Sequence, residues 1–219
     1  MTVVAAARRV DRLEALAAEV DGVHAMRCDV ASDDDLRAVV GRAVELGPLT
    51  VVVNNAGISD APAPAIDEDP AAFRRTVDVN LTATFVLSSL AARAMVDGGI
   101  EGSIVNIASV HGLVASAPNL QAGYVASKTA VVGLTRDLAV QWARHRLRVN
   151  AIAPGYFRTE LTDELIEAET GLAWIERNTP MRRVGELHEL DGVVLLLASP
   201  AGSYVTGQTI VVDGGWTAR

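Results

Sequence analysis

The sequence of 219 residues has a single cysteine, few aromatic residues and no excess of basic charge. With Cys28 alone, an internal disulfide and a metal site of several thiolates are excluded. A formal charge of −8 disfavours nucleic-acid binding, which requires a basic surface. No apolar run approaches the ~18 residues of a membrane span, and the first residues lack the order of regions of a signal peptide. We therefore expect a soluble, cytoplasmic protein with a small-molecule partner, away from membranes and nucleic acids.

The chain also lacks any linker rich in serine, proline or charge, so we expect a single domain over residues 1–219. Hydrophobic residues make up 50% of the sequence, more than a typical soluble monomer needs. Part of this excess is expected to lie between subunits of an oligomer.

Short β-branched runs alternate with longer helical patterns along the whole chain. Strands that are apolar throughout are covered on both faces, and strand-helix-strand units imply a parallel sheet. This predicts an α/β, Rossmann-like doubly wound parallel sheet with helices on both faces, whose ligand sits where the strands end. The predicted strands are 2–7, 22–30, 49–57, 102–109, 147–155 and 208–215, and the predicted helices are 8–20, 33–46, 70–96, 122–145, 162–178 and 187–198.

Tyr124 and Lys128 stand four positions apart in the stretch QAGYVASKTAVV, which has no proline. Four residues are about one helical turn, so the two side chains share one helix face. An ammonium one turn away stabilises a phenolate and lowers the tyrosine pKa from ~10 toward neutrality, which would make Tyr124 a proton-transfer group. An isolated pair at this spacing is more often a solvated surface pair, so its meaning depends on other motifs.

Six short strings together resemble the short-chain dehydrogenase/reductase family over nearly the whole chain. They are NNAG (54–57), VNL (79–81), IVNIAS (104–109), YVASK (124–128), VNAIAPGYFRT (149–159) and VDGG (212–215). The resemblance implies reversible hydride transfer between a nicotinamide cofactor and an alcohol or carbonyl, without a metal.

The resemblance implies four catalytic residues. Tyr124 is the general acid/base, and Lys128 is its modulator, which also holds the nicotinamide ribose. Ser109 donates to the substrate oxygen as charge develops there. Asn80 holds a water that links Lys128 to solvent. Taken alone, Ser109 could simply end a strand, and Asn80 could be a buried asparagine with its hydrogen bonds satisfied.

The implied cofactor contacts follow the ends of several strands. Asp29 and Val30 lie at the adenine, Asn54, Ala56 and Gly57 at the adenosine ribose, and Pro154, Gly155 and Thr159, with Tyr124 and Lys128, at the nicotinamide half. Small residues after a strand let the backbone approach the ribose. Asp29 could also be a plain helix-entry acid, and Pro154-Gly155 a generic turn.

The charges after the first strand favour NADP over NAD. An acid at this place would bond the ribose 2′-hydroxyl of NAD, whereas arginine suits the 2′-phosphate of NADP. Ala7 stands here, followed by Arg8 and Arg9. NAD remains possible, because both arginines could be solvated residues of a first helical turn.

The family's Thr-Gly-x-x-x-Gly-x-Gly phosphate turn has no counterpart, because no glycine precedes Gly22. In the strand order 3-2-1-4-5-6 the strand before that turn is central, and its neighbours here would be strands 2–7 and 49–57. Unpaired groups at a buried edge would cost ~1–3 kcal/mol each. Either the natural chain is longer, which we favour, or the short chain closes its strands together or borrows a strand from a neighbouring subunit.

We therefore expect an oxidoreductase that transfers hydride between NADP(H) and a secondary alcohol or ketone. The alternative is an inactive or truncated subunit that acts as a binding or oligomerisation partner. The segment 156–185 resembles the family's variable substrate-covering region, where Phe157, Leu161, Leu165, Leu172 and Trp174 either line a pocket or form the apolar faces of short helices. VDGGWTAR at the end slightly favours sugar acids. By resemblance we expect a homotetramer joined by helices 70–97 and 122–145 and the last strand.

Overall fold

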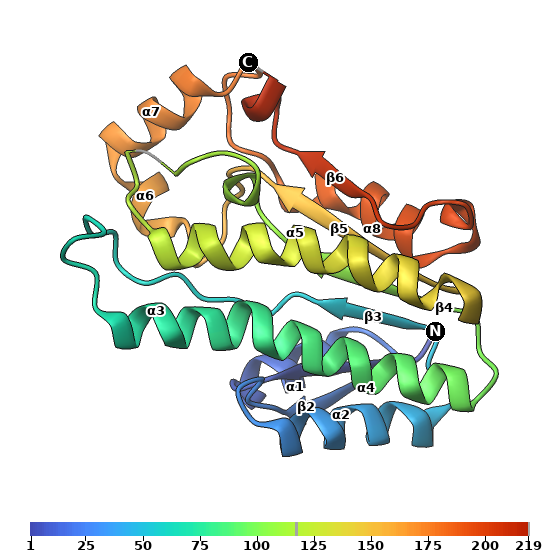
Figure 1. The fold of residues 1–219 in the computed structure, drawn as a ribbon. Helices are drawn as coiled ribbons and strands as arrows, with labels where there is room; N and C mark the ends of the chain where they lie inside the picture. The colour runs from blue at the N-terminus through green and yellow to red at the C-terminus, as the bar shows by residue number, and fades with distance from the viewer. Residues whose placement is uncertain (117, 219) are drawn as a thin grey trace.

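The strands of the computed structural model, which describes residues 1–116 and 118–218, form two separate parallel sheets (Figure 1). The first pairs β1 (Val3–Ala7) with β2 (Val23–Arg27). The second has the order β3-β4-β5-β6, with bounds Val51–Asn54, Gly102–Ile107, Leu147–Pro154 and Thr209–Val212. These strands and their parallel pairing confirm the predicted α/β class.

Helices cover both faces of the larger sheet. On one face, α4 (Ala83–Asp97) and α5 (Ala122–Trp142) pack against a core that includes Ile104 and Val149. On the other face, α8 (Asp191–Ala198) packs through Leu197 against Val105 and Ile152. Because adjacent strand residues point to opposite faces, Ile104 and Val105 belong to different core clusters.

The predicted helix starts are confirmed at two places. Ser32 caps α2 (Asp33–Leu46), and its side chain accepts a hydrogen bond from the backbone of Asp35. Asp69 caps α3 (Pro70–Val77), where Pro70 occupies the first turn. The first helix, α1 (Val10–Glu19), has no side-chain cap and no buried residue.

The helical run from Pro70 to Asp97 is continuous but not uniformly α-helical. A π-helical segment, Asp78–Thr82, separates α3 from α4. By length and composition alone this run could cross a membrane, but the core helix of a globular protein passes the same test. Its buried residues, such as Ala91 and Met95, pack in the core beneath the larger sheet, which accounts for its apolar character.

The predicted helix 162–178 is instead two helices, α6 (Asp163–Glu167) and α7 (Glu169–Asn178). Ala168 between them is extended, with φ −71° and ψ 117°. A side chain at Gly171 would meet the Leu165 carbonyl at 2.1 Å, so α7 folds back closely on α6. Short 3-10 turns lie at Val110–Gly112, Ala143–His145, Leu187–Leu190, Pro200–Gly202 and Trp216–Ala218, and the predicted helix 187–198 begins with one of them.

β1 and β3 do not pair, so the suggestion that a short chain closes its strands together is wrong for this structure. The smaller sheet is held in a different way. Cys28 and Leu36 share a core cluster with Ala83 of α4, so apolar packing on that helix anchors the two-stranded unit. Within the described residues, each of β1 and β3 is hydrogen-bonded to a neighbouring strand on one side only.

Candidate active site

The polar residues predicted for catalysis gather at the carboxyl end of the larger sheet. Ser109 follows β4 and precedes the 3-10 turn Val110–Gly112, and it is buried. A side chain at Gly112 would lie 2.7 Å from the Lys128 carbonyl, so this turn packs directly on α5. Close packing of backbone on backbone therefore sets the position of Ser109 relative to the first turns of α5.

Tyr124 and Lys128 lie on one face of α5, as their spacing predicts. The Lys128 ammonium is 5.8 Å from the centre of the Tyr124 ring and donates a 2.7 Å hydrogen bond to the Ile107 carbonyl. Lys128 is only 4% exposed. It is also the single lysine of the chain. A solvated surface pair would be exposed, so the buried lysine rules out that alternative.

The pKa values of this pair differ from those that the spacing predicts. Burial raises the pKa of Tyr124, and a hydrogen bond with Ser109 opposes this. Burial lowers the pKa of Lys128 to about 8. The expectation that Lys128 lowers the Tyr124 pKa toward neutrality is thus not met, because desolvation is the largest cause acting on each group.

Asn80 lies within the π-helical segment, and its side-chain amide is engaged in three hydrogen bonds. Its oxygen accepts from the Ile58 backbone at 2.8 Å, and its nitrogen donates to the Ile58 carbonyl at 2.9 Å and to Ser127 at 3.0 Å. This matches the simpler alternative of a satisfied buried asparagine. π-Helical segments nevertheless often mark functional sites, and this one brings Asn80 beside the loop at Gly57.

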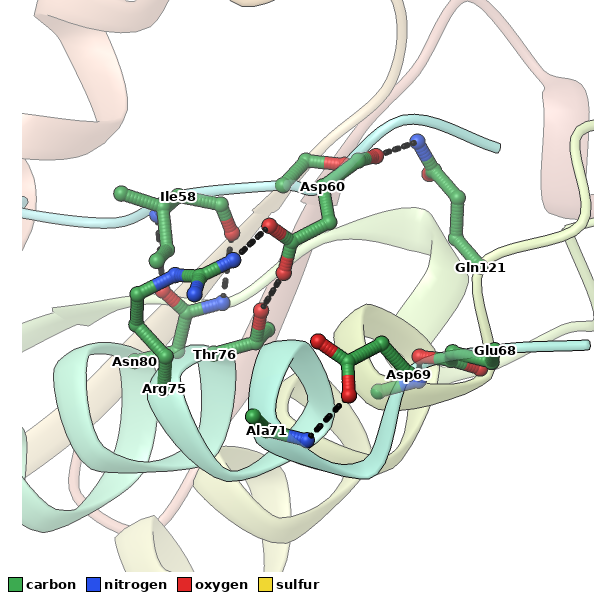
Figure 2. A network of polar contacts seen from close by, with 11 residues as sticks. Ile58, Asp60, Glu68, Asp69, Ala71, Arg75, Thr76, Asn80 and Gln121 are labelled. Atoms are coloured by element: carbon green, nitrogen blue, oxygen red, sulfur yellow. Dashed lines mark hydrogen bonds and ion pairs between the residues drawn. The ribbon is translucent and has the colours of Figure 1, made fainter. Parts of the chain in front are cut away.

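A network of polar contacts joins the segment between β3 and α3 to the start of α5 (Figure 2). The Asp60 carboxylate accepts from Arg75 at 2.6 Å and Thr76 at 2.5 Å, and the Thr76 hydrogen bond lowers the pKa of Asp60. The Asp60 carbonyl accepts from Gln121, at the start of α5. Glu68 accepts from the backbone of Gly123 at 3.0 Å, which satisfies a free amide of the first turn of α5. The network thereby holds the turn that carries Tyr124.

Three of the predicted adenosine contacts have local structural partners. The Asn54 side chain is buried and donates to Ser88 at 2.9 Å and to Asn106 at 2.7 Å. It therefore points into the core and ties β3 to β4, while Ala56 and Gly57 after it are exposed. Asp29 accepts from the backbone of Ala31 at 3.1 Å, and Val30 packs with the cluster around Cys28.

The arginines after β1 differ from one another in their surroundings. Arg9 pairs with Glu160 at 2.7 Å, and Arg12 pairs with the same carboxylate. Arg8 is exposed, and it forms no ion pair among residues 1–116 and 118–218. Glu160 neighbours Thr159, whose hydroxyl lies 3.1 Å from that of Thr162. Pro154 ends β5, and Gly155 donates to the Val212 carbonyl at 2.9 Å.

The sequence assigned no individual role to three residues next to this site: His111, Tyr156 and Trp216. His111 Nε2 is 3.1 Å from the Tyr156 hydroxyl, and the Tyr156 and Trp216 rings are 5.0 Å apart. Of the predicted pocket residues, Trp174 joins this group, Phe157 is buried against Gly185, and Leu161 is 53% exposed. The position of His111 two residues after Ser109 was the available signal, because it places the ring at the same sheet edge.

A serine hydroxyl, a phenol and a buried ammonium at the carboxyl edge of a parallel sheet define the class of nicotinamide-dependent oxidoreductases with a doubly wound fold. A family model described as "Enoyl-(Acyl carrier protein) reductase" matches residues 1–217. The chain belongs to the short-chain dehydrogenase/reductase family and is an NAD(P)-dependent oxidoreductase.

Known members of the family match most of the chain. Galactitol 2-dehydrogenase (L-tagatose-forming) of Cereibacter sphaeroides is 40% identical over 213 residues, 96% of this chain and 83% of the relative. A short-chain dehydrogenase/reductase structure from Mycobacterium marinum has a TM-score of 0.94 and 40% identity, covering 100% of this chain and 86% of the other. A gluconate 5-dehydrogenase from Burkholderia cenocepacia J2315, in complex with NADP and tartrate, has a TM-score of 0.91 and 34% identity, with coverages of 100% and 86%.

Proposed function

We propose that the protein transfers hydride between NADP(H) and one secondary alcohol or ketone group of a polyhydroxylated small molecule, such as a sugar alcohol or sugar acid. The observation that carries the proposal is the buried Lys128 beside Tyr124 and Ser109 at the sheet edge. The substrate class follows from relatives that act on galactitol and gluconate.

Tyr124 exchanges the proton of the reacting oxygen. Because burial raises its pKa, the phenol is protonated at neutral pH and is suited to donate to a carbonyl, in the direction of reduction. Ser109 donates a second hydrogen bond to the same oxygen as charge develops on it. Lys128 places a positive charge beside the phenol and stabilises the phenolate that forms. Asn80 holds the loop after Gly57 through its two hydrogen bonds with Ile58.

The residues around Lys128 suit the ribose next to a nicotinamide. Only one of the three Lys128 N–H groups is bonded among the described residues, which leaves two donors for a diol. A side chain at Gly57 would lie 3.4 Å from the Lys128 nitrogen and 3.3 Å from the Asn80 oxygen, so a glycine keeps this approach open. When bound, the nicotinamide supplies or accepts the hydride. Pro154, Gly155 and Thr159 would border its amide.

The preference for NADP rests on Arg8. An exposed guanidinium without an acidic partner among the described residues is available for a 2′-phosphate, whereas Arg9 and Arg12 share Glu160. Asp29 and Val30 would meet the adenine, and Ala56, Gly57 and the backbone of Asn54 would meet the adenosine ribose. We therefore propose that NADP(H) binds more tightly than NAD(H).

We also propose that the protein forms a homotetramer through α3, α4, α5 and β6. Phe73, Phe85 and Val140 on these helices are 38%, 47% and 80% exposed, and they leave apolar surface that a neighbouring subunit can cover. Burial of these residues between subunits accounts for the apolar composition. Light scattering after size-exclusion chromatography measures the oligomer, and a monomer of 23.0 kDa contradicts this part of the proposal.

Calorimetry and a tyrosine substitution test the function. NADPH is expected to bind with micromolar affinity and more tightly than NADH, and NADPH-dependent reduction of L-tagatose is monitored by absorbance. Tyr124→Phe removes the proton donor and is expected to lower kcat by about 10²- to 10⁴-fold with little change in NADPH affinity. Tyr204→Phe is the matched control, because Tyr204 is fully exposed.

Unchanged turnover in Tyr124→Phe would overturn the assigned role. If the folded chain neither binds a nicotinamide cofactor nor reduces any of a panel of ketoses and keto acids, the alternative of an inactive binding or oligomerisation partner is supported instead.

A further inference from the structure

Tyr156 is held by three rings that come from distant parts of the chain. The ring centres of His111, Trp174 and Trp216 lie 5.8, 6.0 and 5.0 Å from that of Tyr156, all in edge-to-face arrangements. His111 follows β4, Tyr156 follows β5, Trp174 lies on α7 and Trp216 follows β6. Contacts from three sides restrict the Tyr156 ring, so its hydroxyl has a defined position.

The Tyr156 hydroxyl is not saturated by its contact with His111. A phenol has one hydrogen and two acceptor lone pairs, and the 3.1 Å contact with His111 Nε2 uses one of these. At least one lone pair remains for a ligand, whichever ring nitrogen carries the proton. His111 is 7% exposed, and a backbone hydrogen bond at Ala115 opposes the effect of its burial on the pKa. Burial lowers the pKa of His111, so the ring is neutral at pH 7.

This hydroxyl lies beside the reacting groups. The backbone of His111 donates to the Ser109 hydroxyl at 3.2 Å, and Ser109 bonds to Tyr124. Burial, and after it the charge of a Tyr124 phenolate, raises the pKa of Tyr156 to about 12. Tyr156 is therefore a neutral hydroxyl at any physiological pH, and His111 joins it to Ser109, which is proposed to meet the substrate oxygen.

We propose that the Tyr156–His111 pair binds a second hydroxyl group of the substrate, on the carbon next to the one that reacts. This inference rests on the proposed function and deepens it, because it makes a vicinal diol or α-hydroxy ketone the preferred substrate class. A simple secondary alcohol leaves the Tyr156 hydroxyl without this partner in a partly buried site, which penalises its binding. Tyr156 thus determines specificity, and His111 orients it.

Two alcohols that differ by one hydroxyl test the proposal. The wild-type protein is expected to oxidise 2,3-butanediol with a higher kcat/KM than 2-butanol. Tyr156→Phe keeps the ring contacts and removes only the hydroxyl, and it is expected to lower the ratio of the two kcat/KM values by about 5- to 10-fold, mainly through KM for the diol. His111→Gln, which keeps a polar atom near Tyr156, is expected to lower this ratio of kcat/KM values less than His111→Phe does. Tyr204→Phe, the same chemical change at a fully exposed position, leaves the ratio unchanged.

Tryptophan fluorescence provides a readout that does not depend on turnover. Trp174 and Trp216 contact Tyr156, whereas the third tryptophan, Trp142, packs near the far end of α5. Titration with galactitol is expected to give a saturable change in emission, and Tyr156→Phe is expected to weaken the fitted affinity by about 5- to 10-fold.

The outcomes separate this inference from the proposed function. Turnover with an unchanged diol-to-alcohol ratio in Tyr156→Phe overturns the inference and leaves the function intact. Galactitol binding that depends on Tyr156, without turnover, supports the inference and contradicts the function. Neither turnover nor a fluorescence change in the folded wild-type protein overturns both.

Discussion

The two sheets of this protein bury their strands to very different degrees. In the larger sheet, Ile104, Val105, Val149 and Ile152 are at most 1% exposed. In the smaller sheet, neither β1 nor β2 contains a fully buried residue, and α1 beside them contains none. Parallel strands are stable when helices cover both faces and neighbours pair both edges. The larger sheet meets this condition at its centre, and the smaller sheet does not.

The difference in burial coincides with a division of chemical roles. Ser109, Tyr124 and Lys128 all belong to the larger unit. The smaller unit contains Arg8 and Asp29, the residues proposed for the adenosine end of the cofactor. It is attached through the cluster that joins Cys28 and Leu36 to α4. Under the proposed function, proton transfer would depend on the well-packed unit, and dinucleotide affinity would depend on the smaller unit, whose core is shared with α4.

The same substitution in the two units is expected to give the largest contrast in stability. Leu138→Ala on α5 removes a side chain that is 3% exposed within the main core and is expected to lower the free energy of unfolding by about 2–5 kcal/mol. Leu16→Ala on α1, which is 43% exposed, is expected to lower it by about 1 kcal/mol or less. Urea denaturation measures both values.

Hydrogen exchange sharpens this contrast without a mutation. Backbone amides of β1 and β2 are expected to exchange much faster than those of β4 and β5, because local opening of the smaller sheet exposes less apolar surface. The two units would be shown to unfold as one if the amides of both sheets were equally protected and the two leucine variants lost the same free energy of unfolding. That result would contradict the difference in stability between the sheets.

A smaller effect is expected from the buried charge of the larger unit. Burial lowers the pKa of Lys128 in the folded protein to about 8, from its ordinary value of 10.5. Between these values the unfolded state binds more protons, so the stability of the native protein rises with pH across this window, by about 3 kcal/mol. In Lys128→Met this contribution is absent, and the difference between the two pH profiles isolates it.

The single lysine makes the measurement direct, since lysine-specific isotope labelling yields one side-chain signal. The expected midpoint of its NMR titration is about 8. A midpoint near 10.5 would mean that Lys128 is solvated in solution, and the buried ammonium would no longer support the proposed site.

The smallest effect is expected at the ion pairs that connect the two units. Arg9 and Arg12 share Glu160, and all three side chains are more than half exposed. Exposed ion pairs contribute about 0–1 kcal/mol and are screened by salt. Glu160→Gln is therefore expected to change stability by less than about 1 kcal/mol, and to change it less at 0.5 M salt than at low salt. A larger, salt-insensitive loss would mean that these contacts, rather than the cluster on α4, hold the smaller unit.

Much of the fold was predictable because each element carries a local signal. Ser32 and Pro70 mark helix starts, and the apolar runs at 102–107 and 147–154 mark strands covered on both faces. The break at Ala168 was not predicted, and it coincides with a close approach of Gly171 to Leu165 that is made between the two helices. The π-helical turn at Asn80 likewise depends on contacts with Ile58 and Ser127, which are distant in sequence.

The candidate site also combines features that the sequence predicts with features that depend on packing. The spacing of Tyr124 and Lys128 was sufficient to place both side chains on one helix face. Burial lowers the pKa of Lys128 and raises that of Tyr124, and the change for Tyr124 is opposite to the one expected from the sequence. Asn54 stays a prediction at the cofactor, and what the sequence did not predict is that its side chain is directed into the core by Asn106 and Ser88.

The sequence by itself determined the family, the order of strands and helices, and the spacing of the catalytic pair, because these depend on residues close together in the chain. Only the tertiary structure decided that β1 and β3 stand in separate sheets, that Lys128 is desolvated, and that Tyr156 meets His111 beside Ser109. These features depend on which distant segments exclude water from one another. Desolvation is a property of the packed chain and has no local signature in the sequence.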